Sequence, residues 1–222
     1  MEIIKYNSSK RKEWNDFLNS SKNGTFLLNR DFIEYHSDRF IDYSLMFYNK
    51  KTLVALLPLN IDENNLFSHG GLTYGGFIVS RNITTVLMLD IFEKLLSFLK
   101  VNKIKKLVFK SIPHIYHKIP SEEESYCLFR YNFSLLKREI SSTINMKTTN
   151  IRGKKMNGYR KAIKLGLKIN ETSDCSSIIT IVNSNLNEKY NTKAVHTADE
   201  LNSLKLNFKN EIKFLNLEIN NE

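Results

Sequence analysis

A short window of the sequence, Ser68 to Phe77, carries the residue types best suited to chemistry. It reads Ser-His-Gly-Gly-Leu-Thr-Tyr-Gly-Gly-Phe and holds four of the eight glycines of the chain, together with His69 and Tyr74. Imidazole and phenol groups handle protons, and a glycine backbone can approach a ligand closely because it lacks Cβ. The window therefore predicts either a ligand-facing loop or a pair of tight turns between strands.

A second candidate group lies between two prolines. Tyr116 and His117 follow Pro113 and precede Pro120. Proline restricts the backbone around it, so the side chains between the two are displayed in an extended segment. His117 is a candidate base or acceptor-site group and Tyr116 a candidate binding residue, with an ordinary surface loop as the alternative.

Cationic side chains are densest between residues 152 and 168. Arg160, Lys161 and Lys164 follow one another at spacings that let them share a broad helix face. Such a face could neutralise the phosphate oxygens of an anionic ligand. A solvated helix face is the alternative.

The composition and the missing motifs exclude several classes of protein. The chain is 41% hydrophobic and 25% charged, as in ordinary globular proteins. It shows no signal core and no apolar run that could span a bilayer, which predicts a cytoplasmic protein. No serine-hydrolase, Walker or zinc motif is present, and Cys127 and Cys175 are far apart, so no metal is predicted. The net charge of +10 would suit nucleic acid, an anionic membrane or a phosphorylated substrate, and does not choose among them.

The elements that must position these residues are predicted from periodicity. Two apolar runs, 43–48 and 52–60, predict an antiparallel hairpin. A helical pattern over 83–101 and an alternating pattern over 103–110 add a crossover helix and a strand, which implies parallel neighbours. The first half of the chain is therefore predicted to be an α/β (α+β) domain with a mixed, mostly antiparallel sheet flanked by helices.

The second half predicts shorter elements. Residues 133–144 are predicted to form a strand, and a Thr197–Glu200 capping box is predicted to begin a late helix. Other patterns predict helices at 153–165 and 174–189 and strands at 167–170 and 212–219. The predicted strand at 212–219 is the last element of the sequence, and a helix followed by such a strand is typical of the start of a new sheet. We therefore expect residues 1–192 to form a first lobe and residues 193–222 to begin an incomplete second lobe.

Four groups of short segments follow one another along the chain. They are Asn23-Gly24-Thr25-Phe26-Leu27 with Tyr35-His36 and Arg39-Phe40; the glycine window; Ile112-Pro113-His114-Ile115-Tyr116-His117 with Pro120 and Glu123; and Arg160-Lys161-Ala162-Ile163-Lys164-Leu165-Gly166 with Val195-His196-Thr197 and Glu200-Leu201. Their order resembles that of the Fem-like (FemAB-type) transferases, two-lobed members of the GNAT superfamily described as peptidoglycan or cell-envelope biosynthesis proteins. The resemblance covers nearly the whole chain, but the second GNAT-like lobe of such proteins and the GNAT pyrophosphate loop have no clear counterpart.

The resemblance implies a GNAT-like fold and transfer of an acyl or aminoacyl group to an amino group of a cell-envelope precursor. That precursor would be a small molecule or nucleotide-linked; acyl-CoA (acetyl-CoA) is the favoured donor and a charged tRNA the alternative. Transfer to an amine needs a proton acceptor and an oxyanion partner. The candidate catalytic residues are His69, Tyr74 and His117. The candidate substrate-binding residues are Gly70, Gly71, Gly75, Gly76, Tyr116, Arg160, Lys161 and Lys164.

Two alternatives from other classes stay open. A non-catalytic, truncated GNAT-like lobe would bind an anionic ligand or a partner subunit, and its unpaired final strand would favour a homodimer. Nucleic-acid binding through the basic segment would show a steep salt dependence. It ranks last, because the aromatic residues fall in the predicted core and are not interleaved with the basic ones.

Overall fold

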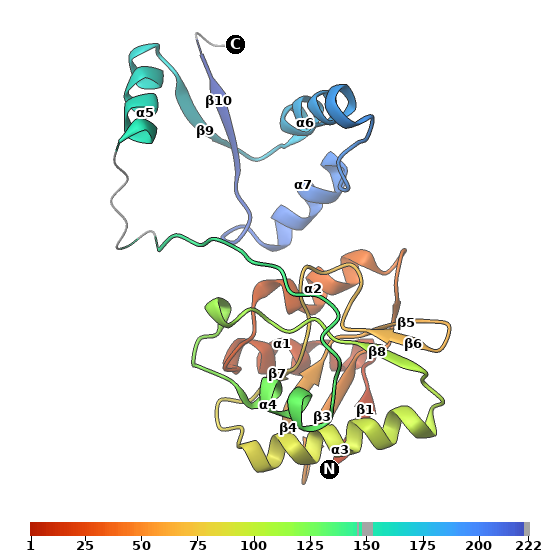
Figure 1. Cartoon of the computed structure of the whole chain (residues 1–222). Coiled ribbons are helices and arrows are strands. Elements are labelled where there is room, and N and C mark those ends of the chain that lie inside the picture. The colour runs from red at the N-terminus through yellow and green to blue at the C-terminus, as the bar shows by residue number, and fades with distance from the viewer. Residues whose placement is uncertain (146, 148–152, 220–222) are drawn as a thin grey trace. The chain divides into compact units, whose positions relative to one another are not determined.

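The computed structural model describes residues 1–145, 147 and 153–219, in two compact units divided between Leu135 and Leu136 (Figure 1). The division lies earlier than the expected lobe boundary at 192/193. The reason is that β9 (Lys168–Thr172) pairs with β10 (Phe214–Glu218), which ties both sides of residue 192 into one unit. The assignment of residues 193–222 to a further lobe stays a prediction. Within the described ranges, no helix is long and apolar enough to cross a bilayer.

Unit 1, Met1–Leu135, contains two four-stranded sheets. The first has the order β1-β3-β4-β7 and is antiparallel; its strands are β1 (Glu2–Lys5), β3 (Leu45–Asn49), β4 (Thr52–Leu57) and β7 (Ile78–Val79). The second has the order β2-β5-β6-β8, with strands β2 (Ile41–Asp42), β5 (Asn60–Asp62), β6 (Asn65–Phe67) and β8 (Lys106–Val108). The β6–β8 pair is parallel, which confirms the predicted crossover.

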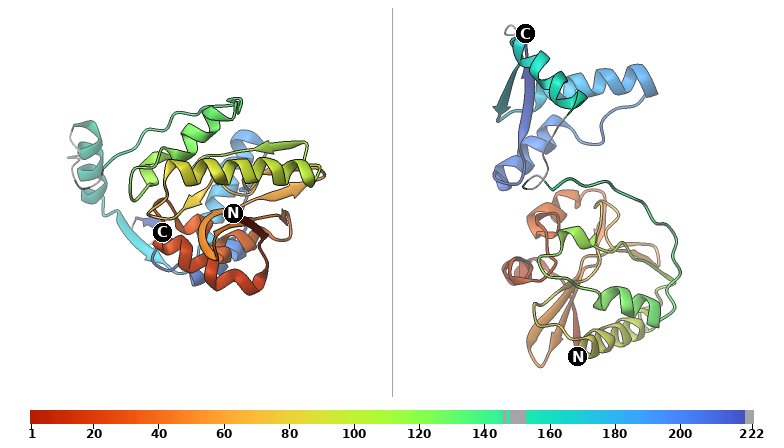
Figure 2. Two further views of the ribbon diagram at one scale, coloured as in Figure 1. Left: turned by 90° about the horizontal axis from the view of Figure 1, so that it is seen from below. Right: turned by 60° about the vertical axis from the view of Figure 1, so that its left-hand side comes forward.

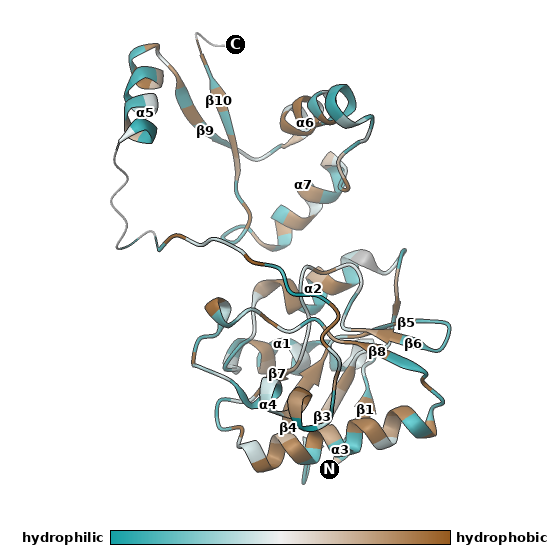
Figure 3. Ribbon diagram, in the orientation of Figure 1, coloured by the Kyte–Doolittle hydropathy of each residue, from teal (hydrophilic) through white to brown (hydrophobic). Residues whose placement is uncertain are grey.

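Helices cover both faces of the first sheet, so its central strands are buried on both sides. Leu45 and Phe47 of β3 pack with α3 (Thr85–Val101), whereas Met46 and Tyr48 pack on the side of α1 (Arg11–Ser20) and α2 (Arg30–Ile33) (Figure 2). Figure 3 shows the resulting concentration of apolar residues in β3, β4 and α3. The short helices are η1 (Ser8–Lys10), η2 (Phe26–Leu28), η3 (Glu34–His36), η4 (His114–Tyr116) and α4 (Glu123–Arg130).

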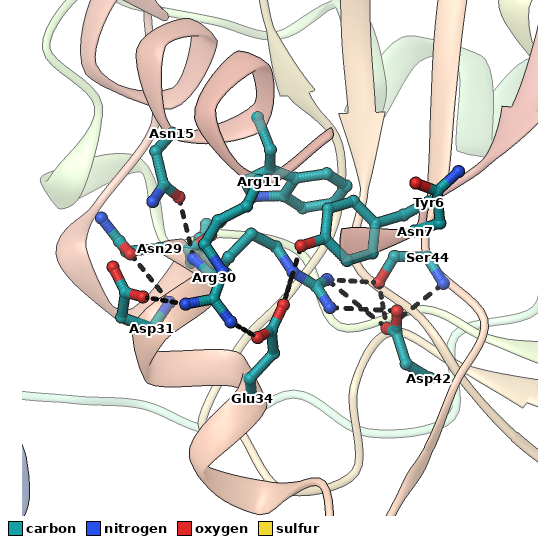
Figure 4. Close-up of polar contacts among 12 residues, drawn as sticks. Tyr6, Asn7, Arg11, Asn15, Asn29, Arg30, Asp31, Glu34, Asp42 and Ser44 are labelled. Atoms are coloured by element: carbon teal, nitrogen blue, oxygen red, sulfur yellow. Dashed lines mark hydrogen bonds and ion pairs between the residues drawn. The ribbon is translucent and has the colours of Figure 1, made fainter. Parts of the chain in front are cut away.

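A buried arginine links α2 to the strands. Arg30 is 1% exposed, and its guanidinium contacts Glu34 at 3.2 Å, Asp42 at 3.0 Å and the Ser44 hydroxyl at 3.1 Å (Figure 4). The guanidinium carbon lies 3.6 Å from the centroid of the Tyr6 ring. A buried charge is tolerated only when it is paired and hydrogen-bonded. Arg30 therefore fixes α2 relative to β1 and to the segment before β3.

Unit 2 is built on the antiparallel β9–β10 pair. Its helices are α5 (Lys154–Lys164), α6 (Ser176–Tyr190) and α7 (Ala198–Asn207). The predicted capping box is confirmed: the Glu200 amide donates to Thr197 Oγ1 at 3.2 Å, and the Thr197 amide donates to the Glu200 carboxylate at 2.8 Å. Leu204 of α7 and Phe214 of β10 are among the few buried apolar side chains described in unit 2.

The strand predicted at residues 133–144 is wrong. These residues lie outside any strand or helix. Leu135, Leu136 and Ile140 are 72%, 70% and 96% exposed. An apolar pattern becomes a strand only where a neighbour satisfies its backbone, and no described strand pairs with this segment.

Candidate functional site

The glycine window forms a folded loop between β6 and β7. It is held near both ends by β8 and the residues just after β8: the Ser68 amide donates to the carbonyl of Val108 at 2.8 Å, and the Gly75 amide to that of Lys110 at 2.9 Å. Within the loop, the Leu72 amide donates to the His69 carbonyl at 3.1 Å. The window thus contains a tight turn and places its residues in two different environments.

The second glycine pair is required by packing. A Cβ on Gly75 would lie 2.1 Å from the carbonyl oxygen of Ser68, and Gly76 has φ +76°. Only glycine fits both demands. The Gly70 amide, in turn, donates to the side-chain oxygen of Asn60 at 2.6 Å, and Gly71 is half-buried. The amides of Gly70 and Gly75, expected to contact a substrate, are thus engaged within the protein.

The structure brings Tyr74 and Tyr116 together. Their ring centroids are 5.4 Å apart, and the buried Tyr74 hydroxyl is 2.9 Å from Thr25 Oγ1. Burial raises the pKa of Tyr74, so this group is a neutral phenol that can donate or share a proton. It is not a base near pH 7.

His117, beside Tyr116, is held as a neutral imidazole. Its Nε2 is 3.1 Å from the carbonyl oxygen of Ile112. A carbonyl can only accept, so Nε2 carries the proton and Nδ1 keeps its lone pair. Nδ1 is enclosed and has no hydrogen-bond partner in the described part of the chain. Burial lowers the pKa of His117, which keeps the imidazole in the form that can accept a proton.

His69 and Gly70 lie in a different environment, beside a pocket. The His69 ring is buried and packs 5.5 Å from the ring of Phe40, and Gly70 lines the pocket itself. The pocket has a volume of about 470 Å³, which suits a small ligand. Its lining includes two rings, two groups of opposite charge and an amide: Phe40, Phe67, Arg39, Asp62 and Asn60. Such a pocket could hold a ligand that has an amine, an anionic group and an apolar body.

Sequence reasoning missed most of the pocket. Arg39 and Phe40 appear only within the segments of the family resemblance, and Asp62 lies in none of them. The pocket forms because β2 pairs with β5 and β5 with β6, which brings three separate segments together. No local sequence pattern predicts such pairing between separate segments.

Two half-buried ionisable groups around the window were also missed. The Lys110 ammonium donates to the Leu72 carbonyl, and burial lowers the pKa of Lys110. The Glu124 carboxylate accepts from the Phe77 amide at 2.6 Å, and burial raises the pKa of Glu124 to about 7. Lys110 thus holds the middle of the window and Glu124 holds its last residue. In sequence they are ordinary charged residues near a strand end and a helix start.

Replacing Glu124 by Gln is expected to change the pH dependence of stability. Between the ordinary pKa of 4.5 and about 7, the folded protein keeps a proton on Glu124 that the unfolded chain releases. The wild-type free energy of unfolding should therefore fall as the pH rises through this range, by up to about 1.4 kcal/mol per unit, and the effect of this group should level off above it. Gln still accepts from Phe77 but does not titrate.

Urea unfolding at pH 5 and at pH 7.5 measures this difference. The wild type should lose stability relative to Glu124→Gln, whereas the control Glu122→Gln, at an exposed neighbour, should follow the wild type. Parallel curves for the wild type and Glu124→Gln would show that Glu124 does not titrate in this range.

The remaining predicted residues lie in unit 2. Arg160, Lys161 and Lys164 are exposed on α5, and the window lies in unit 1. Among the described residues, no group of three His, Cys, Asp or Glu side chains is arranged to hold a metal. Cys127 and Cys175 are free, buried thiols.

The two α/β units, with mostly antiparallel sheets and flanking helices, agree with the predicted fold class. The comparison with solved structures bears this out: a crystal structure of FemX matches 99% of this chain with a TM-score of 0.62 and 10% sequence identity. The chain spans 58% of the length of FemX.

A second solved structure matches less well. It is the apo form of the aminoglycoside antibiotic 6'-N-acetyltransferase AAC(6')-Ig from Acinetobacter haemolyticus, which matches 65% of this chain and 98% of its own length, at 11% identity and a TM-score of 0.38. That score is too low to carry an argument. No protein-family model and no curated protein matches the sequence.

Proposed function

We propose that this chain is the acceptor-binding part of a Fem-like transferase that moves an acyl or aminoacyl group onto an amino group of a cell-envelope precursor. The observation that carries the proposal is the likeness to FemX over 99% of the chain. The pocket beside the glycine window supports it, because a Fem-like transferase needs an acceptor site on the protein.

The pocket suits an acceptor that carries both charge signs. Asp62 would attract a protonated amine, and Arg39 a carboxylate or phosphate. Phe40 and Phe67 would cover the apolar part of the ligand. An amino sugar or a peptide-bearing nucleotide has these features.

The proposed chemistry is direct attack by the amine. The nitrogen lone pair forms a C–N bond to the acyl carbon, the C–S bond of a CoA thioester or the C–O bond of an aminoacyl ester breaks, and the surplus proton of the amine passes to a base. His69 is the proposed base: it does not line the pocket itself, but it packs against Phe40 and precedes Gly70, which do. On the other side of the window, His117 remains a candidate base and Tyr74 a candidate proton donor. Arg160, Lys161 and Lys164 are proposed to meet phosphates.

Calorimetric titration with a UDP-linked muramoyl peptide and with acetyl-CoA tests this function. Phe40→Ala and Asp62→Asn are each expected to weaken binding of the muramoyl peptide by about tenfold, since each removes one of the few contacts that anchor a ligand. Phe129→Ala is the matched control, because Phe129 is 79% exposed and lies in α4, outside the pocket. Failure of a folded sample to bind either ligand would refute the catalytic proposal.

The second candidate is a lobe that binds an anionic ligand or a partner subunit without turnover. The observation in its favour is that Arg160, Lys161 and Lys164 are exposed together on α5, which suits an anionic ligand. Mass spectrometry of the muramoyl peptide after incubation with acetyl-CoA separates the two. Binding without a gain of one acetyl group favours the non-catalytic lobe.

A further inference from the structure

Helix α5 presents an apolar stripe to solvent. Met156, Tyr159 and Ile163 follow at intervals of three and four residues, which places them on one face of the helix. Tyr159 is 55% exposed and Ile163 48% exposed, and Met156 is half-buried. Large apolar side chains that line up on one exposed helix face form a patch of the kind that binds a partner.

The charges around the stripe indicate which partner it fits. The helix carries Lys154, Lys155, Arg160, Lys161 and Lys164 and no acidic residue. Four residues are slightly more than one helical turn. Lys155, four residues before Tyr159, therefore lies at one edge of the stripe, and Arg160, four residues after Met156, lies at the other edge. None of these cations forms an ion pair with a carboxylate in the part of the chain that the structure describes. Figure 3 shows apolar and polar residues mixed along α5.

We propose that α5 is an interfacial helix that docks unit 2 on an anionic bilayer surface. Tyr159 and Ile163 would enter the boundary between headgroups and acyl chains, while Lys155 and Arg160 extend along the surface to lipid phosphates. The net charge of +10 would add long-range attraction. A nucleic acid would bind the cations but leave the apolar stripe exposed to water. An anionic bilayer would contact both the cations and the stripe, so it is the partner that we propose. The proposal goes beyond the transferase function and does not depend on it.

Vesicle co-sedimentation of the full chain tests the proposal. The chain should bind vesicles that mix phosphatidylcholine with phosphatidylglycerol, bind poorly to phosphatidylcholine alone, and release as salt is raised. The double variant Lys155→Glu/Arg160→Glu and the single variant Ile163→Asp should each lower the partition coefficient by at least about tenfold.

The matched control is Lys193→Glu/Lys209→Glu. It changes the net charge by the same amount at exposed positions of unit 2 outside α5, and it should retain most of the binding. Circular dichroism confirms that each variant is folded, and Ile163→Asp provides a second probe if the double variant is not. Equal losses in the control and α5 variants, or no binding to the anionic vesicles, would overturn the proposal. The proposal would also be overturned if the chain bound a single-stranded oligonucleotide but not the vesicles, and if Ile163→Asp left the oligonucleotide binding unchanged.

Discussion

Replacing Arg30 by alanine is expected to lower the free energy of unfolding of unit 1 by roughly 3–5 kcal/mol. The substitution removes the cation that neutralises Glu34 and Asp42 and leaves Ser44 without one of its hydrogen-bond partners. It also opens a cavity beneath the Tyr6 ring. Loss of one member of a largely buried ionic group costs more than the group contributes, because the two carboxylates left behind, Glu34 and Asp42, have side chains only 25% and 31% exposed and regain little hydration.

Denaturant unfolding followed by tryptophan fluorescence measures this effect in unit 1. Trp14 is the single tryptophan of the chain, it is fully buried, and the Arg30 guanidinium lies 5.0 Å from its ring. Arg11→Ala is the matched control: Arg11 contacts the same Glu34, but its side chain is 47% exposed, so a loss of about 1 kcal/mol or less is expected. Equal losses for the two variants would mean that the Arg30 cluster is not a buried anchor.

Replacing Gly75 by alanine is expected to lower the free energy of unfolding by about 3 kcal/mol or more. The added methyl group would meet the Ser68 carbonyl oxygen at 2.1 Å and the Ser68 carbonyl carbon at 2.8 Å. Both are backbone atoms, and Ser68 is held by β8, so neither side can yield without breaking the loop. The two ends of the window should then separate.

Gly158→Ala makes the contrast with Gly75→Ala. Gly158 lies within α5 and nothing stands within 4 Å of its added Cβ, so alanine should stabilise the helix by up to about 1 kcal/mol. Thermal melts followed by circular dichroism compare the two variants. A Gly75→Ala protein with wild-type stability would contradict the packing of the window described above.

Elements with strong local patterns could be predicted from the sequence. Three such elements are the hairpin of β3 and β4, the long helix α3 and the capping box before α7. Each depends on residues that lie close together in the sequence. Local propensity and periodicity decide such elements. The segment 133–144 had the same kind of apolar pattern but no partner strand, which shows where local reasoning fails.

The parts of the site that could not be predicted depend on distant contacts. The window was recognised by its glycines, but its division into a Tyr74 side and a His69 side depends on Thr25, Phe40 and Lys110. Buried charges such as Arg30 and Glu124 look like surface residues in the sequence, because burial is a property of the tertiary fold. The grouping of residues on both sides of position 192 into one unit likewise depends on a non-local contact, the pairing of β9 with β10.

Hydrogen–deuterium exchange of the chain with and without a UDP-linked muramoyl peptide tests the central proposal most directly, because it locates the bound acceptor. If the pocket is the acceptor site, exchange should slow in residues 39–42 and 60–71, which carry the pocket lining. It should stay unchanged around the shallow hollow on α1 lined by Lys12, Glu13 and Asp16. Unchanged exchange across 39–42 and 60–71 under saturating peptide, or slowing confined to α5, would contradict the assignment of the pocket as the acceptor site.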